Sequence, residues 1–187
     1  MTDDKETRIL DAAAELFASR PFHRVLLSDV AAAARVGKGT LYLYFNGKDD
    51  LYLAVLFREF SALVERLHAH MDEDAPAREQ MAAAVRELAL HMFGKAHIME
   101  LMRGAVVDCP RTNEWQDKRR ELRGVFEAII RRGIGQGVFE DPDPRLTAQY
   151  VPGLMRSACL FQPEGTDAAD MVAHATAFVL RGLEART

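Results

Sequence analysis

The residues best suited to chemistry lie in a short stretch ending at residue 48. If residues from about 38 to 45 form a helix, Leu41 and Phe45 lie on one side and Gly39, Thr40 and Leu43 on the other. In a DNA major groove, glycine permits close approach, threonine can hydrogen-bond a base edge and leucine can contact a thymine methyl group. This face therefore predicts base contacts by Lys38, Gly39, Thr40 and Leu43.

Phosphate contacts are expected on either side of that face. Tyr42 and Tyr44 fall on its flanks, where their hydroxyl groups would meet the DNA backbone. Lys48 falls in the first turn of the next helix, capped by Asn46, where a cation opposes the helix dipole unless an anion binds there. A solvated lysine is the alternative. The predicted phosphate contacts are Arg24, Ser28, Tyr42, Tyr44 and Lys48.

The charge distribution supports a local DNA-binding surface. The 187-residue chain has a net charge of −4, which is unusual for a nucleic-acid-binding protein. Between Arg20 and Lys48, however, five Lys and Arg residues stand against Asp29 alone, giving +4. The positive charge is therefore confined to the stretch with the predicted DNA contacts. The rest of the chain is acidic, which would keep its other surfaces away from DNA.

Two short helices around a tight turn would position these side chains. Ser28 is a good N-cap for an alanine-rich helix, and Arg35-Val36-Gly37 interrupts it before the second helix begins near Lys38. Two helices joined by a short turn that contains glycine form the helix-turn-helix pattern. A preceding helix is expected over 3–19, stopped by Pro21, and a following one over about 47–71.

The rest of the chain also predicts helices throughout, hence an all-α fold. Helices are expected to end at Gly94, before Cys109, near Gly133 and near Phe161, with a last one to about residue 185. Asp143 and Pro144 form a strong helix start. We predict a DNA-binding domain over 1–48 and a second helical domain over 49–187, with the helix over about 47–71 linking them.

Methionine, histidine and aromatic residues of the second domain could line a cavity for an apolar ligand, although such residues are more often plain core. The candidates are His91, Met92, His97, Met99, Met102, Trp115, Phe126, Tyr150, Met155 and Cys159. His68 and His70 diverge by about 200° on a helix, so they favour no metal site. Cys109 and Cys159 are expected to be reduced, with a redox role left open.

The last two helices are rich in small residues and are apolar on more than one face, which indicates burial against a second copy of the chain. An internal hairpin of a monomer is the alternative. The predicted homodimer interface comprises Leu154, Ala158, Met171, Ala175, Phe178, Val179 and Gly182.

On these residues the sequence resembles the tetracycline-repressor (TetR) family of bacterial regulators. The resemblance is carried by Ile9–Ala13, Leu16, Phe17, Phe22, Val30, Ala31, Ala34, Val36–Phe45, Lys48 and Leu51. It implies a nine-helix, all-α homodimer with DNA-binding helices at its N-terminus and a ligand pocket in its C-terminal domain. It also implies that ligand binding shifts the fourth helix and releases the operator.

The sequence departs from the family pattern at three places. Pro21 replaces a usual glycine, and Val25–Ser28 replaces a segment with threonines, so Ser28 or backbone N–H groups must contact phosphate. Arg35 replaces the usual glycine of the turn, which leaves Gly37 to supply flexibility.

The resulting prediction is a cytoplasmic, ligand-responsive repressor that binds a near-palindromic double-stranded DNA operator as a homodimer and is released by a small, apolar effector. The alternative is an all-α small-molecule-binding protein without a DNA role, and activation rather than repression also stays open. The chain has none of the common catalytic motifs, no cofactor is expected, and no stretch approaches the ~20 apolar residues of a membrane span.

Overall fold

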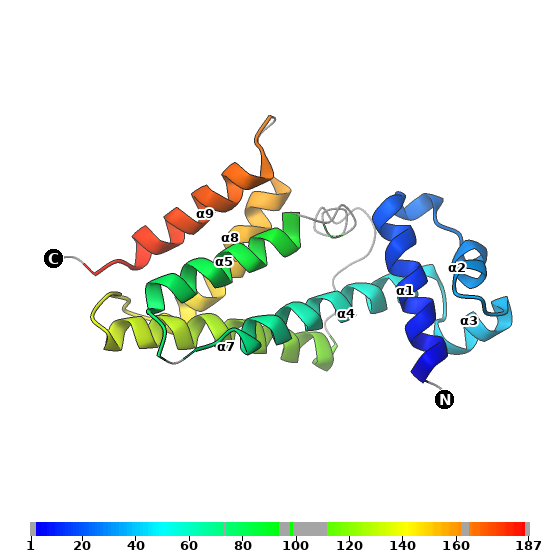
Figure 1. Ribbon diagram of the computed structural model, residues 1–187, viewed down its shortest axis with the longest axis horizontal. Helices are drawn as coiled ribbons and strands as arrows, with labels where there is room; N and C mark the ends of the chain where they lie inside the picture. Colours follow the sequence, from blue (N-terminus) through cyan, green and yellow to red (C-terminus); the bar gives the residue numbers. More distant parts are fainter. Residues whose placement is uncertain (1–2, 73, 94–97, 99–111, 162–164, 186–187) are drawn as a thin grey trace. The chain divides into compact units, whose positions relative to one another are not determined.

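The structure, a computed structural model, describes residues 3–72, 74–93, 98, 112–161 and 165–185 (Figure 1). These residues form eight α-helices and one 3-10 helix, and the chain divides into two compact units, of which the first contains residues 1–60 and the second 61–94 and 110–187. The all-α prediction is confirmed, and the helix expected before Cys109 lies outside the described residues. The helices are α1 (Asp3–Ser19), η1 (Phe22–Arg24), α2 (Leu27–Ala33), α3 (Lys38–Tyr44), α4 (Lys48–Ala69), α5 (Ala77–Phe93), α7 (Asn113–Gly135), α8 (Pro144–Leu160) and α9 (Ala168–Leu183).

The first unit is built on the amphipathic helix α1, whose bounds match the predicted ones. Ile9, Ala13 and Phe17 recur on one side of α1 and are buried. Helix α1 packs against α2, and α2 against α3. Leu41 and Tyr52 are fully buried in the same unit, one from α3 and one from α4. The core therefore fixes the side of α3 that is left for solvent.

The start of α2 corrects one prediction. The helix begins at Leu27, so its N-cap is the extended Leu26 rather than Ser28, and no side chain caps it. The Leu26 carbonyl instead accepts backbone bonds from Asp29 at 3.0 Å and Val30 at 3.2 Å. Burial of Val30 anchors the helix, so tertiary packing and not a polar cap sets where it begins.

The turn between α2 and α3 corrects a second prediction. Arg35 has a φ of 54°, in the left-handed region that glycine adopts readily. Gly37 has a φ of −69°, which any residue can adopt, and serves as the N-cap of α3. The arginine itself therefore takes the conformation for which the family pattern uses glycine.

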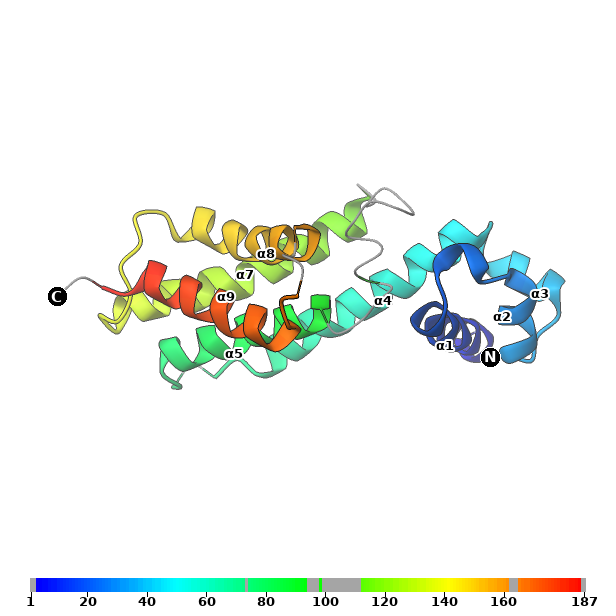
Figure 2. The same cartoon turned by 90° about the horizontal axis from the view of Figure 1, so that it is seen from above.

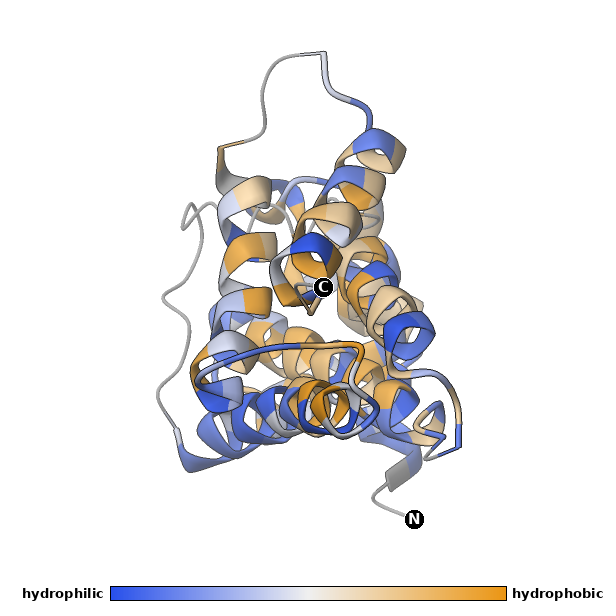
Figure 3. Cartoon of the chain, turned by 90° about the vertical axis from the view of Figure 1, so that its left-hand side faces the viewer, coloured by the Kyte–Doolittle hydropathy of each residue, from blue (hydrophilic) through white to orange (hydrophobic). Residues whose placement is uncertain are grey.

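The second unit contains α5, α7, α8 and α9 (Figure 2). Helix α5 packs against α7, α8 and α9, and α7 packs against α8. The helices carry both hydrophilic and hydrophobic residues around their circumference (Figure 3). Met81, Phe126, Ile130 and Met155 are fully buried, so α5, α7 and α8 share one core.

Two helix starts and one helix end stabilise this unit locally. As predicted, Asp143 caps α8, and its carboxylate accepts from the Leu146 amide at 3.2 Å. Asp167 caps α9 by accepting from the Ala169 amide. At the end of α7, the ring of Phe139 packs directly on Gly133, where no side chain intervenes. Phe139 also forms an isolated antiparallel bridge with Glu184, so the segment after α7 pairs with the end of α9.

Candidate nucleic-acid interface

Helix α3 presents the predicted reading face to solvent. Leu41 and Phe45 are buried, whereas Leu43 is 84% exposed and Gly39 is exposed. A Cβ added at Gly39 would meet no atom within 4 Å, so this part of the helix is open for close approach. Thr40 is half-buried beside them. A large apolar side chain held almost fully in water suits contact with a partner surface.

The flanking positions differ from one another. Tyr42 is 49% exposed, while Tyr44 is half-buried and its ring lies 6.4 Å from that of Phe45. Ser28 is exposed in the first turn of α2, and Arg24 is exposed in η1. The side chains of Tyr42, Ser28 and Arg24 thus reach solvent, as contacts to phosphates require.

One of the five basic residues in this stretch is paired with its single acidic residue. Arg20 forms an ion pair with Asp29, Nη1 to Oδ2, at 3.3 Å. The side chains of Lys38 and Arg35 are exposed and form no hydrogen bond or ion pair with the described residues. Arg35 is not one of the predicted DNA contacts, although it belongs to the same local cluster of basic residues.

Lys48 does not extend into solvent. Its ammonium group donates to the carbonyl oxygens of Phe22 at 3.0 Å and Val25 at 3.2 Å, and it lies 4.4 Å from the centroid of the Phe22 ring. Asn46 precedes α4 as predicted, but it donates to the Asp50 carboxylate instead of accepting at the helix start. Sequence spacing gave no sign of the internal bonds of Lys48, because their acceptors are backbone atoms.

In the second unit, large apolar side chains are exposed on α8, at the residue that follows it and on α9. Tyr150 is 60% exposed, Phe161 78% and Phe178 58%. A groove of about 510 Å³ is lined by residues of both helices. It is lined by Leu154, Ala158, Phe161, Thr166, Asp170, Met171, His174, Ala175 and Phe178, among which are five of the predicted interface residues. Of the other two, Gly182 is exposed and Val179 is 7% exposed.

The predicted pocket residues do not all gather in one place. Met92, Trp115, Phe126 and Met155 are buried, and His91 is half-buried. Tyr150, by contrast, points to solvent from α8. His97, Met99, Met102 and the side chain of Cys159 lie outside the described residues.

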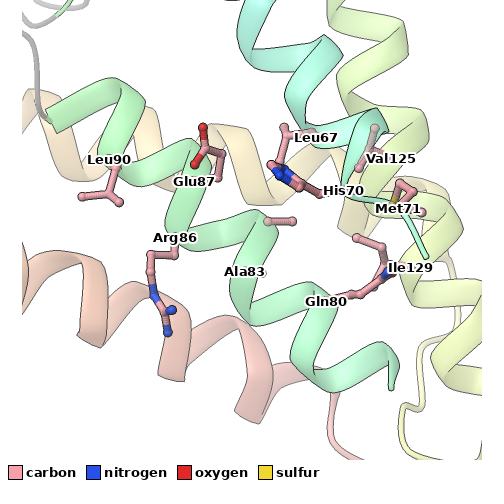
Figure 4. Close-up of a pocket in the computed structure, with 11 residues that line it drawn as sticks. Leu67, His70, Met71, Gln80, Ala83, Arg86, Glu87, Leu90, Val125 and Ile129 are labelled. Carbon is pink, nitrogen blue, oxygen red and sulfur yellow. The ribbon is translucent and has the colours of Figure 1, made fainter. Parts of the chain in front are cut away.

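A separate groove of about 360 Å³ lies among α4, α5 and α7 (Figure 4). Its lining includes none of the predicted pocket residues; it comprises Leu67, His70, Met71, Gln80, Ala83, Ala84, Arg86, Glu87, Leu90, Val125 and Ile129. Beside it, Arg66 of α4 pairs with Glu87 of α5 at 2.9 Å. In the part of the chain that the structure describes, no group of His, Cys, Asp and Glu side chains could hold a metal ion. No helix within those same residues is long and apolar enough to span a bilayer.

Two regions of the chain match known families. Residues 9–55 match the family described as bacterial regulatory proteins, tetR family. Residues 74–183, more than half of the chain, match the tetracyclin repressor-like C-terminal domain. The first match includes α2 and α3, and the second includes α5, α7, α8 and α9.

Individual relatives agree with these matches. The fatty acid metabolism regulator protein of Bacillus subtilis (strain 168) is 28% identical over 155 residues, which is 80% of this chain and 78% of that protein. The crystal structure of the transcriptional regulator FadR from Bacillus subtilis in complex with stearoyl-CoA superposes with a TM-score of 0.73 at 21% identity, covering 94% of this chain and 98% of that one.

The fold extends to other regulators. A regulator of the TetR/AcrR family from Thermobifida fusca superposes with a TM-score of 0.79 at 23% identity, covering 96% of this chain and 98% of that one. The sequence matches over both regions lead to one conclusion: this chain belongs to the TetR family of bacterial regulatory proteins and is a DNA-binding transcriptional regulator.

Proposed function

We propose that the protein is a cytoplasmic repressor that binds a near-palindromic operator as a homodimer and leaves it when an apolar effector binds. The observation that carries this proposal is the face of α3 opposite Leu41 and Phe45, where Gly39 is open and Leu43 is 84% exposed. Helix α3 would enter the major groove with this face toward the bases.

The contacts follow from the exposure of the surrounding side chains. Lys38, Gly39, Thr40 and Leu43 would meet base edges, since all four lie on the open side or the first turn of α3. Arg24, Ser28, Tyr42 and Tyr44 would meet phosphates. Phosphate contacts set register and affinity, while base contacts set the sequence that is preferred.

The homodimer would form through α8 and α9. Their exposed apolar residues and the groove between the helices offer a surface that a second copy would cover. A dimer with two-fold symmetry presents two copies of α3, which explains the expected palindromic operator.

The effector is proposed to be a long-chain acyl thioester. The support is the similarity to the fatty acid metabolism regulator of Bacillus subtilis and to the FadR structure that holds stearoyl-CoA. The second unit also has the apolar interior that an acyl chain would need, with Met92, Phe126 and Met155 buried in it.

The experiment is a fluorescence-anisotropy titration of the protein with duplexes from the DNA flanking its own gene. We expect Leu43→Ala to lower operator affinity by about tenfold, the free-energy equivalent of a lost apolar base contact, and to relax base preference at one position of each half-site. Leu90→Ala is the matched control, because Leu90 is a 53% exposed leucine of α5.

Stearoyl-CoA added to the complex should release the duplex, whereas free coenzyme A should not. If Leu43→Ala and Leu90→Ala bind the operator equally well, α3 does not read the bases through this face. If stearoyl-CoA leaves the complex intact while Leu43→Ala weakens it, the proposed effector class is wrong and the DNA-binding role stands.

A further inference from the structure

The ammonium group of Lys48 joins the first turn of α4 to the segment between α1 and α2. Both of its acceptors, the carbonyl oxygens of Phe22 and Val25, belong to or directly follow the 3-10 helix η1. The carbonyl of Phe22 also accepts the amide of Val25 at 3.2 Å, so this oxygen has two donors. A cation at the carbonyl end of a short helix is favourable, because the carbonyl dipoles point toward it.

An aromatic cluster holds the same segment from the other side. Phe22 stacks on Phe17 of α1 with a centroid distance of 5.8 Å and lies 4.9 Å from Tyr52 of α4. Tyr52 in turn meets Phe17 edge to face at 4.7 Å. Lys48 and Tyr52 are four residues apart on α4 and therefore lie on one face of it. The ammonium group of Lys48 and the ring of Tyr52 therefore both contact the ring of Phe22.

The position of this segment matters for the reading helix. Val25 is buried and is followed at once by Leu26, the N-cap of α2. Helix α2 then packs against α3, which carries the reading face. Displacing the Val25 carbonyl would therefore displace the start of α2 and, through it, α3.

Two of the three N–H donors of Lys48 are thus used within the protein, and its side chain is partly buried. Moving the ammonium outward to a phosphate would leave two carbonyls without this donor and would remove the charge from the Phe22 ring. Lys38, which is exposed and has no partner among the described residues, carries no such cost.

We propose that Lys48 is a positioning residue rather than a phosphate ligand: its ammonium ties α4 to the Phe22 and Val25 carbonyls and so holds α2 and α3 in the geometry that reads bases. The inference rests on the proposed DNA-binding function of α3. It replaces the sequence-based prediction of a phosphate contact at Lys48.

The first test needs no DNA. Limited acetylation of the free native protein with acetic anhydride, followed by peptide mass spectrometry, compares Lys48 with Lys38. Lys48 should react at least about tenfold more slowly, because its amine must first leave two hydrogen bonds. It should remain equally protected when operator DNA is added. Equal rates in the free protein, or protection of Lys48 only on DNA, would overturn the proposal.

The second test uses Lys48→Met, with Arg24→Met as the matched loss of an exposed cation. For Lys48→Met we expect operator affinity to fall by about tenfold while affinity for a scrambled duplex, and its salt dependence, stay unchanged. Arg24→Met should weaken both duplexes alike and reduce the salt slope by about one unit.

The outcomes separate the possible roles. If Lys48→Met reduces the salt dependence of affinity for the scrambled duplex, Lys48 binds a phosphate and the proposed positioning role is wrong. Circular dichroism checks that the Lys48→Met variant is folded. If the folded variant keeps the wild-type ratio of operator affinity to scrambled-duplex affinity, the hydrogen bonds of Lys48 serve stability alone and the positioning role is also wrong. If the wild-type protein binds no operator, the proposed function fails, while the acetylation result still decides whether the Lys48 ammonium group is held by the Phe22 and Val25 carbonyls.

Discussion

At the scale of single residues, Arg35 takes a backbone conformation that is unfavourable for a residue with a side chain. Its φ of 54° is a conformation that costs a non-glycine residue about 1–2 kcal/mol. Its side chain is exposed and has no partner among the described residues, so nothing in the free protein offsets that cost. A contact between this exposed guanidinium group and a DNA phosphate would favour arginine at this position.

We expect Arg35→Gly to raise the free energy of unfolding by about 0.5–1 kcal/mol, because relief of the strained φ exceeds the added freedom of the unfolded chain. Urea denaturation followed by circular dichroism measures it. Arg24→Gly is the control: Arg24 has no positive φ, so glycine there should lower stability. Equal losses in both variants would show that the turn at residue 35 is not strained.

The residue scale is also where prediction from sequence was weakest. Spacing along α3 was enough to place Leu41 inside and Leu43 outside, because helical periodicity determines faces. Spacing could not reveal that Lys48 bonds to the Phe22 carbonyl, since any residue supplies such an acceptor. Side-chain chemistry alone predicts Ser28 as the cap, whereas α2 begins earlier, at Leu27, and is anchored by the buried Val30.

At the scale of elements, the end of α7 depends on one missing side chain. A Cβ at Gly133 would lie 2.0 Å from Cδ2 of Phe139, and two further ring atoms would lie 2.7 Å away. The ring is buried, and the segment that carries it pairs with Glu184 after α9. Two elements far apart in sequence are therefore held together through this contact.

Gly133→Ala should lower the free energy of unfolding by about 3 kcal/mol, since the ring or the helix must move in a packed core. Gly124→Ala in the same helix is the matched control. An added Cβ there meets no atom within 4 Å, and alanine should stabilise α7 by up to about 1 kcal/mol. Urea unfolding of both variants decides the matter, and similar stabilities would show that the Phe139 contact is dispensable.

Element boundaries were predicted well where local chemistry is strong. The Asp143–Pro144 start of α8 combines a capping carboxylate with a residue preorganised for the first helical turn. The residues that line a pocket are harder to predict, because composition indicates an apolar interior but not which side of a helix faces it. Its residue type makes Tyr150 a candidate for the pocket, but its side chain lies on the exposed side of α8.

At the scale of the whole molecule, several large apolar side chains are exposed on α8, just after it and on α9. Leu146, Tyr150, Phe161 and Phe178 are all large, apolar and at least 46% exposed. A concentration of such residues along one face is typical of a surface that a partner covers. If that partner is a second copy, the two reading helices act together and operator affinity depends on dimerisation.

Phe178→Glu should raise the dimer dissociation constant by at least about tenfold, because a charge would be buried at an apolar interface. Analytical ultracentrifugation measures the shift, and operator affinity should fall with it. Leu90→Glu introduces the same charge at a 53% exposed leucine of α5 and should leave the dimer intact. A wild-type protein that sediments as a monomer would contradict the proposed assembly outright.

The brevity of α2 and α3 has a practical consequence. Each helix has seven residues, about half the length at which an isolated helix begins to persist in water. A synthetic peptide covering 27–45 should be a random coil, and grafting it onto a foreign scaffold should transfer no DNA sequence preference. A change of DNA sequence preference therefore requires side-chain substitutions within the intact protein.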